Sequence, residues 1–188
     1  MELRGNNSLL ACLAFLIALS GSVGAITVDS CETLSIANET YNLNTDINSS
    51  GTCLTIGASD VILDCQENSI TGENASGSYG ISANGKSNVT IKNCNIRDYQ
   101  YGIYLDSSNS STLENNTASS NARWGIILDS SSFNSLTNNT AHSNGYDGIL
   151  LDTSSNNNTL TNNNASSNVW FGIYLDTSSE FNTLDDNT

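Results

Sequence analysis

The sequence of 188 residues contains no proline, one histidine and only five lysine and arginine residues, against 19 aspartate and glutamate residues. The formal net charge of −14 provides no basic surface for phosphate groups, so we expect neither a nucleic-acid partner nor an anionic membrane partner. One histidine and the lack of a C-x-x-C pair argue against a zinc site. After residue 25 no apolar run is long enough to span a bilayer, so we expect no transmembrane segment in the mature chain.

The first 25 residues have the pattern of a secretory signal peptide. Arg4 lies in a short polar start, residues 9–19 are apolar, and residues 23–25 supply the small side chains that precede a cleavage site. A lipoprotein signal ending at Cys12 is the alternative, but the apolar run continues past this cysteine. We therefore predict a secreted or cell-surface protein, extracellular or periplasmic. Nine N-x-[ST] sequons follow residue 25, so we expect the exported chain to be a glycoprotein.

Asparagine, serine and threonine dominate the residues that are present. They number 29, 30 and 18, which is 77 of the 188 residues. Their side chains compete for the hydrogen bonds of a helix backbone and favour turns, and the 14 glycines add further turn positions. The composition therefore disfavours helices and predicts many short turns.

A repeat of 22 to 24 residues fills the C-terminal half of the chain. The blocks YGIYLDSS, WGIILDSS, DGILLDTS and FGIYLDTS begin at Tyr101, Trp124, Asp147 and Phe171, and a fainter copy begins at Tyr79. Each unit alternates like a strand and has room for three short strands but not for a helix. A leucine-rich repeat would need a denser leucine pattern, and a propeller blade needs about 40 residues. We therefore predict an all-β parallel β-helix, a solenoid of five to six coils.

The repeat also divides the chain. We assign residues 1–25 to the signal peptide, residues 26–52 to an N-terminal cap and opening coil, and residues 53–188 to the β-helix repeats, which end in mid-coil. An uncapped coil end exposes unpaired strand edges, so we expect end-to-end association there.

Four cysteines remain after the signal, and an even set is typical of exported proteins with disulfides. Four thiols allow three pairings. Aligning the second strands of two neighbouring coils puts Cys65 and Cys94 on adjacent coils with Cα atoms roughly 6 Å apart, a distance that a disulfide accepts. We favour Cys31–Cys53 and Cys65–Cys94, and the sequence leaves the other pairings open.

Asparagine pairs recur at one corner of every unit. Asparagine tolerates a left-handed backbone, and its amide can donate to one neighbouring coil and accept from the other. Amides that satisfy one another in this way need no further ligand, so we predict a structural ladder. Its members are Asn116, Asn139, Asn163 and Asn187.

From Cys31 to the C-terminus the chain resembles the NosD-type β-helix repeats, also described as the carbohydrate-binding and sugar-hydrolase repeat family of exported archaeal and bacterial surface proteins. The resemblance lies in GTCLTIGASDVILDCQENSITG, in NVTIKNCNIRDYQYGIYLD and in the NNT corners. It implies a right-handed single-stranded parallel β-helix. It says little about function, because the same coil serves lyases, epimerases, hydrolases and inert spacers.

The resemblance implies two activities, and the sequence departs from both. Copper handling needs methionine, histidine or free cysteine ligands, whereas the mature chain has no methionine and one histidine. Uronan epimerases of this fold carry an Asp-Pro-His motif, which a chain without proline lacks. No catalytic residue therefore carries over, and copper is not supported as a cofactor.

A column of carboxylates is predicted to face outward, four residues after the repeated glycines. Neighbours on successive coils would lie ~4.8 Å apart, where like charges repel by about 1 kcal/mol even in water. We favour turn capping, in which backbone N–H groups donate to the carboxylates. A bridging Ca²⁺ with about six to eight oxygen ligands is the functional alternative. The column comprises Asp106, Asp129, Asp152 and Asp176.

Aromatic side chains gather beside this column and at the corner before it. Their faces suit a sugar chain laid across the coils, but packing and strand propensity explain them too, and we favour the structural explanation. The carbohydrate-binding candidates are Tyr104, Tyr174, Trp124 and Phe171.

We interpret the protein as an exported cell-surface β-helix that serves as a structural or carbohydrate-binding module, with polysaccharide or other surface proteins as partners. The alternatives are a polysaccharide-active enzyme of the lyase, hydrolase or epimerase type, and a fragment of a longer surface protein. We favour a non-catalytic role, because identical repeats do not give two carboxylates the unequal environments that separate an acid from a base.

Overall fold

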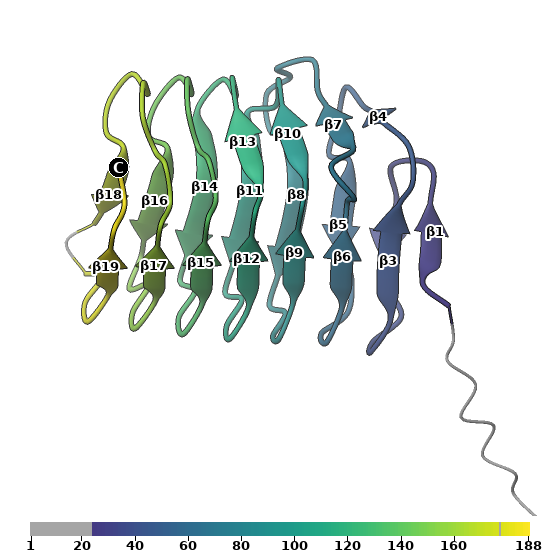
Figure 1. The fold of residues 1–188 in the computed structure, drawn as a ribbon, viewed down its shortest axis with the longest axis horizontal. Helices are drawn as coiled ribbons and strands as arrows, with labels where there is room; N and C mark the ends of the chain where they lie inside the picture. Colours follow the sequence, from purple (N-terminus) through teal and green to yellow (C-terminus); the bar gives the residue numbers. More distant parts are fainter. Residues whose placement is uncertain (1–23, 177) are drawn as a thin grey trace, which may run out of the picture.

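The computed structural model describes residues 24–176 and 178–188, so most of the expected signal peptide lies outside the described residues. The described residues form nineteen short strands and no helix, in agreement with the composition. The strands stack into an elongated solenoid, with β1 (Ile26–Val28) near one end and β19 (Thr183–Asp185) at the other (Figure 1). Within this part of the chain, nothing helical is long and apolar enough to cross a membrane.

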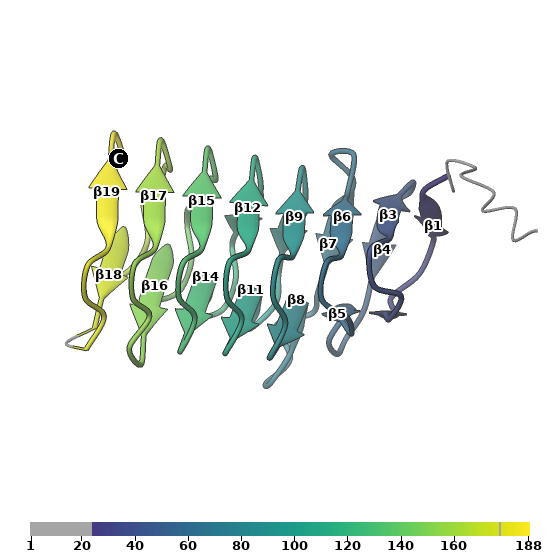
Figure 2. The ribbon, with the colours of Figure 1, turned by 90° about the horizontal axis from the view of Figure 1, so that it is seen from below.

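The coils contribute strands to three parallel sheets that run along the axis of the solenoid (Figure 2). The eight-stranded sheet comprises β1, β3 (Thr40–Leu43), β6 (Ile62–Asp64), β9 (Thr90–Lys92), β12 (Thr112–Glu114), β15 (Ser135–Thr137), β17 (Thr159–Thr161) and β19. The seven-stranded sheet comprises β2 (Thr33–Leu34), β5 (Leu54–Ile56), β8 (Tyr79–Asn84), β11 (Tyr101–Asp106), β14 (Trp124–Asp129), β16 (Ile149–Asp152) and β18 (Ile173–Leu175). The four-stranded sheet comprises β4 (Ile47–Asn48), β7 (Ser69–Thr71), β10 (Asn95–Arg97) and β13 (Thr117–Ser119).

The strand order gives about seven turns, more than the five to six that the repeat predicts. The difference lies in the segment 26–52, whose strands β2, β3 and β4 pair in parallel with β5, β6 and β7 of the following coil. This segment carries no G-I-x-L-D block and is predicted as a cap and opening coil, whereas its strands stack in the same way as those of the later coils.

The repeated blocks stack in the register that their spacing predicts. Ile103 lies opposite Ile126, which lies opposite Ile149, and the leucines two residues later align in the same way. All these side chains are fully buried. Because alternate residues of a strand point to opposite faces, the isoleucine and leucine columns face inward and form the core.

The glycine before each isoleucine is required by close packing. A Cβ atom on Gly125 would lie 2.7 Å from the amide nitrogen of Asn144 and 2.7 Å from the backbone oxygen of Gly148. A core packed at this density has no space for a side chain there, which explains why every block keeps its glycine.

Buried amides form a continuous ladder at one corner. The amide nitrogen of Asn139 donates to the Leu113 carbonyl at 2.9 Å and to Oδ1 of Asn163 at 3.0 Å. Its Oδ1 accepts from the backbone N–H and from the amide of Asn116, both at 3.0 Å. Asn163 repeats the pattern with Asn187. A second ladder, which the sequence analysis does not predict, joins the amides of Asn121, Asn144 and Asn168.

Two disulfides join neighbouring coils at the N-terminal end. Cys31 pairs with Cys53 and Cys65 pairs with Cys94, with Cα–Cα distances of 4.4 and 4.8 Å. This is the pairing that the sequence favours among the three.

Candidate functional site

The outer face of the seven-stranded sheet carries a column of stacked aromatic rings. The rings of Tyr79, Tyr101 and Trp124 lie on successive coils, and their centroids are 4.8 and 5.6 Å apart. Asp147 occupies the same repeat position on the next coil, and the column resumes with Phe171. At this repeat position the column is therefore interrupted for one coil, although Tyr146, one residue before Asp147, makes an edge contact with Trp124 at 4.9 Å and stacks on Trp170 at 4.2 Å.

A parallel column on the same face is interrupted for two coils, one of which is the coil of Asp147. Tyr104 and Tyr174 belong to it, with Ile127 and Leu150 between them in register. The coil of Leu150 thus carries no ring in either column, while the coils on either side of it carry Trp124 and the pair Phe171–Tyr174. Two coil spacings separate these walls, which is ~9.6 Å.

The interruption creates a hollow of about 360 Å³. Leu150, with 7% of its surface exposed, lies among the hollow's lining residues. Two van der Waals contacts take up about 8 Å, so the walls leave space for one flat ring between them. The lining residues are Trp124, Asp147, Leu150, Asp152, Trp170, Phe171, Tyr174 and Asp176.

Asp147 is the buried carboxylate of the hollow and is 2% exposed. Its two oxygens accept from the indole N–H of Trp124 at 2.9 Å and from the backbone N–H of Phe171 at 3.0 Å. Asp147 is not among the site residues predicted from the sequence. The available signal is the repeat itself, since Asp147 is the one block-initial residue that is not aromatic.

Asp152 and Asp176 are the partly exposed carboxylates of the hollow. Burial raises the pKa of Asp152, and the carboxylates of Asp176 and Asp129 raise it further, against a lowering by the backbone N–H of Thr153, which donates at 2.8 Å. Part of this rise therefore comes from the like charge of the neighbouring carboxylates. The hollow is thus aromatic and electronegative.

The other two members of the predicted carboxylate column, Asp106 and Asp129, are not among the residues that line the hollow. Asp106 accepts from the amide of Asn84 and from the hydroxyl of Ser107, both at 2.8 Å, and Asp129 accepts from the hydroxyl of Tyr104 at 2.9 Å. The donors to these two carboxylates are thus side chains, whereas the predicted turn capping would use backbone N–H groups. Among residues 24–176 and 178–188, no three His, Cys, Asp or Glu side chains form a group that could hold a metal ion.

The hollow brings together three of the four aromatic candidates, Trp124, Phe171 and Tyr174, and adds Trp170. Tyr104 does not line the hollow. Its ring lies 5.1 Å from that of Tyr79, and burial together with the hydrogen bond to Asp129 raises the pKa of its hydroxyl.

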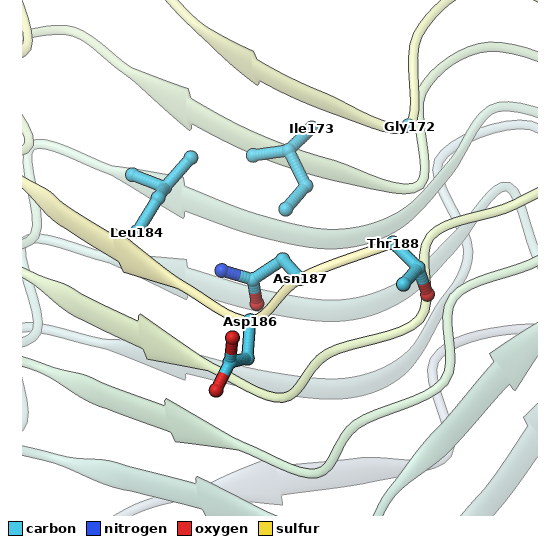
Figure 3. Close-up of a pocket in the computed structure, with 6 residues that line it drawn as sticks. All are labelled: Gly172, Ile173, Leu184, Asp186, Asn187 and Thr188. Carbon is cyan, nitrogen blue, oxygen red and sulfur yellow. The ribbon is translucent and has the colours of Figure 1, made fainter.

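A second depression lies at the C-terminal end of the solenoid (Figure 3). Ile173 and Leu184 line it, and they occupy the positions that Ile149 and Leu160 fill as buried residues one coil earlier. The depression is the uncovered interior of the last coil, with Leu184 45% exposed. End-to-end association through this face stays a prediction.

The family model described as the right-handed beta helix region matches residues 24–188. A search of curated proteins finds no significant match to this chain.

Solved structures share the architecture at low sequence identity. A periplasmic alginate epimerase is 20% identical, with a TM-score of 0.62 over 83% of this chain and 35% of that chain. An alginate lyase from Paenibacillus sp. str. FPU-7 is 13% identical, with a TM-score of 0.63 over 87% and 65%. The catalytic domain of an α-1,3-glucanase in complex with nigerose is 19% identical, with a TM-score of 0.57 over 87% and 39%. The chain spans less than two thirds of each of these proteins, and the likeness shows the fold alone.

Proposed function

This chain belongs to the right-handed β-helix family, and from that premise we propose that it is an exported protein that binds polysaccharide in the hollow between Trp124 and Tyr174. The observation that carries the proposal is the lining of the hollow, which combines aromatic rings with carboxylates. Aromatic faces pack against the apolar faces of sugar rings, and carboxylates accept hydrogen bonds from sugar hydroxyls. A pocket of this size with few polar groups is typical of a small-ligand site.

The shape of the hollow supports a chain-like ligand of which one unit is held firmly. Trp124 on one side and Phe171 with Tyr174 on the other leave space for a single ring above Leu150. Trp170, 59% exposed, extends the aromatic surface beyond the hollow, where a neighbouring sugar unit would lie.

Export to an oxidising compartment is part of the proposal. The two disulfides support it, because such bonds persist outside the cytoplasm. The periplasmic location in the name of the similar alginate epimerase agrees with it. We place the chain with the NosD-type repeats within the family on the sequence blocks quoted above.

A polysaccharide-active enzyme is the second candidate. The similar structures are an epimerase, a lyase and a glucanase. The hollow also supplies unequal carboxylates, since Asp147 is buried and bonded to two N–H groups while Asp152 is partly exposed and has a raised pKa. Acid–base catalysis needs two carboxylates in unequal environments. The repeats therefore do not exclude catalysis, because Asp147 breaks their identity at this coil.

The test is retention of the secreted chain on an array of polysaccharides, with wild type, Tyr174→Ala and Trp170→Ala compared. Phe133→Ala is the matched control, because Phe133 is 64% exposed and does not line the hollow. We expect each hollow variant to weaken retention about tenfold, which corresponds to about 1.4 kcal/mol, and the control to retain its ligands.

Equal retention by all four proteins would overturn the proposal. The same samples distinguish the second candidate, because an enzyme shortens or converts the retained polysaccharide, while a binding module leaves its length and composition unchanged.

A further inference from the structure

We infer that the sugar unit held in the hollow carries a protonated amino group, so that the ligand is a polymer of amino sugars and not of uronic acids. This inference rests on the proposed function and names the ligand class of the same site.

Three of the residues that line the hollow carry carboxylates. Asp147 lies at the interrupted column, while Asp152 ends β16 and Asp176 follows β18 on the next coil. Asp129 lies opposite Asp152 in the register of the sheet and adds a fourth carboxylate beside the hollow. Neighbouring coils are ~4.8 Å apart, a separation at which like charges repel by about 3 kcal/mol at the effective dielectric of a protein surface.

Positive charge is absent from the lining residues. Lys92 forms an ion pair with Asp64, and Arg97 forms one with Asp98. None of these four residues lines the hollow. Arg123 is the remaining basic side chain after Arg97, and its guanidinium lies 5.6 Å from the ring centroid of Trp124, outside the lining. A uronate in the hollow would therefore meet three carboxylates and no basic residue among the lining side chains.

An ammonium group on the sugar would be attracted to the lining carboxylates, whereas a uronate would be repelled by them. It would sit between Asp152 and Asp176, relieve their repulsion and donate hydrogen bonds to both carboxylates. The stacked rings of Phe171 and Tyr174 line the same hollow, and an ammonium group over a ring face would add a cation–π attraction. A neutral sugar makes the same ring contacts but leaves the carboxylates unneutralised.

The experiment measures the affinity of the secreted chain for four oligosaccharides of equal length by titration calorimetry at pH about 5.5, which lies above the ordinary pKa of an aspartate and below that of an aliphatic amine. The probes are a glucosamine oligomer, its N-acetylated counterpart, a neutral glucan and an alginate oligomer. The acetylated oligomer is the matched ligand control, because acetylation removes the charge and keeps the sugar ring. We expect it to bind at least tenfold more weakly than the glucosamine oligomer, and the alginate oligomer not to bind.

Variants separate a specific site from general attraction to an acidic protein. Asp176→Asn is expected to weaken binding of the glucosamine oligomer about tenfold, while Asp106→Asn, in the same column but outside the hollow, is expected to leave it unchanged. Equal losses in the two variants would overturn the inference.

The ligand panel separates failure of the inference from failure of the proposed function. Equal or tighter binding of the acetylated, neutral or uronate oligomer overturns the amino-sugar inference and leaves polysaccharide binding in place. If none of the four binds and the polysaccharide array is also silent, both fail.

Discussion

Replacing Asn139 with alanine removes one rung of the buried amide ladder. Asn139 has no exposed surface, and its side chain takes part in four hydrogen bonds of 2.9–3.0 Å with Leu113, Asn116 and Asn163. The alanine variant keeps the backbone N–H, which donates to Oδ1 of Asn163 at 2.9 Å. The perturbation is therefore confined to the amide and to the small void that it leaves.

Loss of the four hydrogen bonds alone is expected to cost about 4 kcal/mol. Each lost hydrogen bond contributes about 1 kcal/mol, and a buried group left without a partner costs about 1–3 kcal/mol more. The Leu113 carbonyl and the Asn116 backbone N–H are the groups that lose this partner. Asn139→Asp keeps the volume but replaces the donor with a carboxylate oxygen facing two acceptors, so it should be at least as destabilising at neutral pH.

Urea unfolding followed by circular dichroism measures both free energies of unfolding. Asn164→Ala is the matched control, because Asn164 is exposed and accepts only a local bond from Ser166 at 3.2 Å among its recorded side-chain bonds, and it should change stability by about 0.5 kcal/mol or less. A loss below about 1 kcal/mol in Asn139→Ala, or a loss no larger than that of the control, would refute the ladder as a source of stability.

Three further predictions concern other parts of the fold. Gly125→Ala should lower the melting temperature, because its Cβ would lie 2.7 Å from a backbone oxygen of the next coil, whereas Gly51→Ala, where the nearest atom is 4.0 Å away, should not. The double variant Cys65→Ser with Cys94→Ser opens a cross-link between residues 29 apart in sequence and should cost about 3–4 kcal/mol in denaturant unfolding. Asp152→Asn should stabilise the protein at neutral pH, because the raised pKa means that the charged form is disfavoured on folding, and the gain should vanish as the pH falls below about 3.8.

The coil architecture could be predicted because one repeat fixes both period and register. The glycine spacing of the blocks places Ile103 opposite Ile126, and strand alternation then assigns the inner and outer faces. The turn count fell short because the segment 26–52 forms its strands without the repeated block, so no periodic signal marks it.

The site could be predicted only in part. The repeat identifies Trp124 and Phe171 as members of an outer column, but the hollow depends on a missing ring, at Asp147, between two present ones. Selecting carbohydrate-binding candidates by aromatic residue type identifies the rings on either side of the hollow, but it does not identify Asp147, the position where a ring is missing. Tyr104 shows the opposite error, because it is predicted as a binding residue and does not line the hollow. Its ring packs on Tyr79 and its hydroxyl donates to Asp129 on the next coil. These contacts depend on side-chain directions, which the repeat does not specify.

The most direct test of polysaccharide binding in the hollow uses the chain's own tryptophans. The sequence has two, Trp124 and Trp170, and both line the hollow. We predict that an oligosaccharide retained by the protein shifts tryptophan emission in a saturable titration, protects both indoles from a neutral quencher, and gives the same Kd as retention does. A retained oligosaccharide that leaves the emission and the quenching unchanged would contradict the account, since it would bind elsewhere on the solenoid.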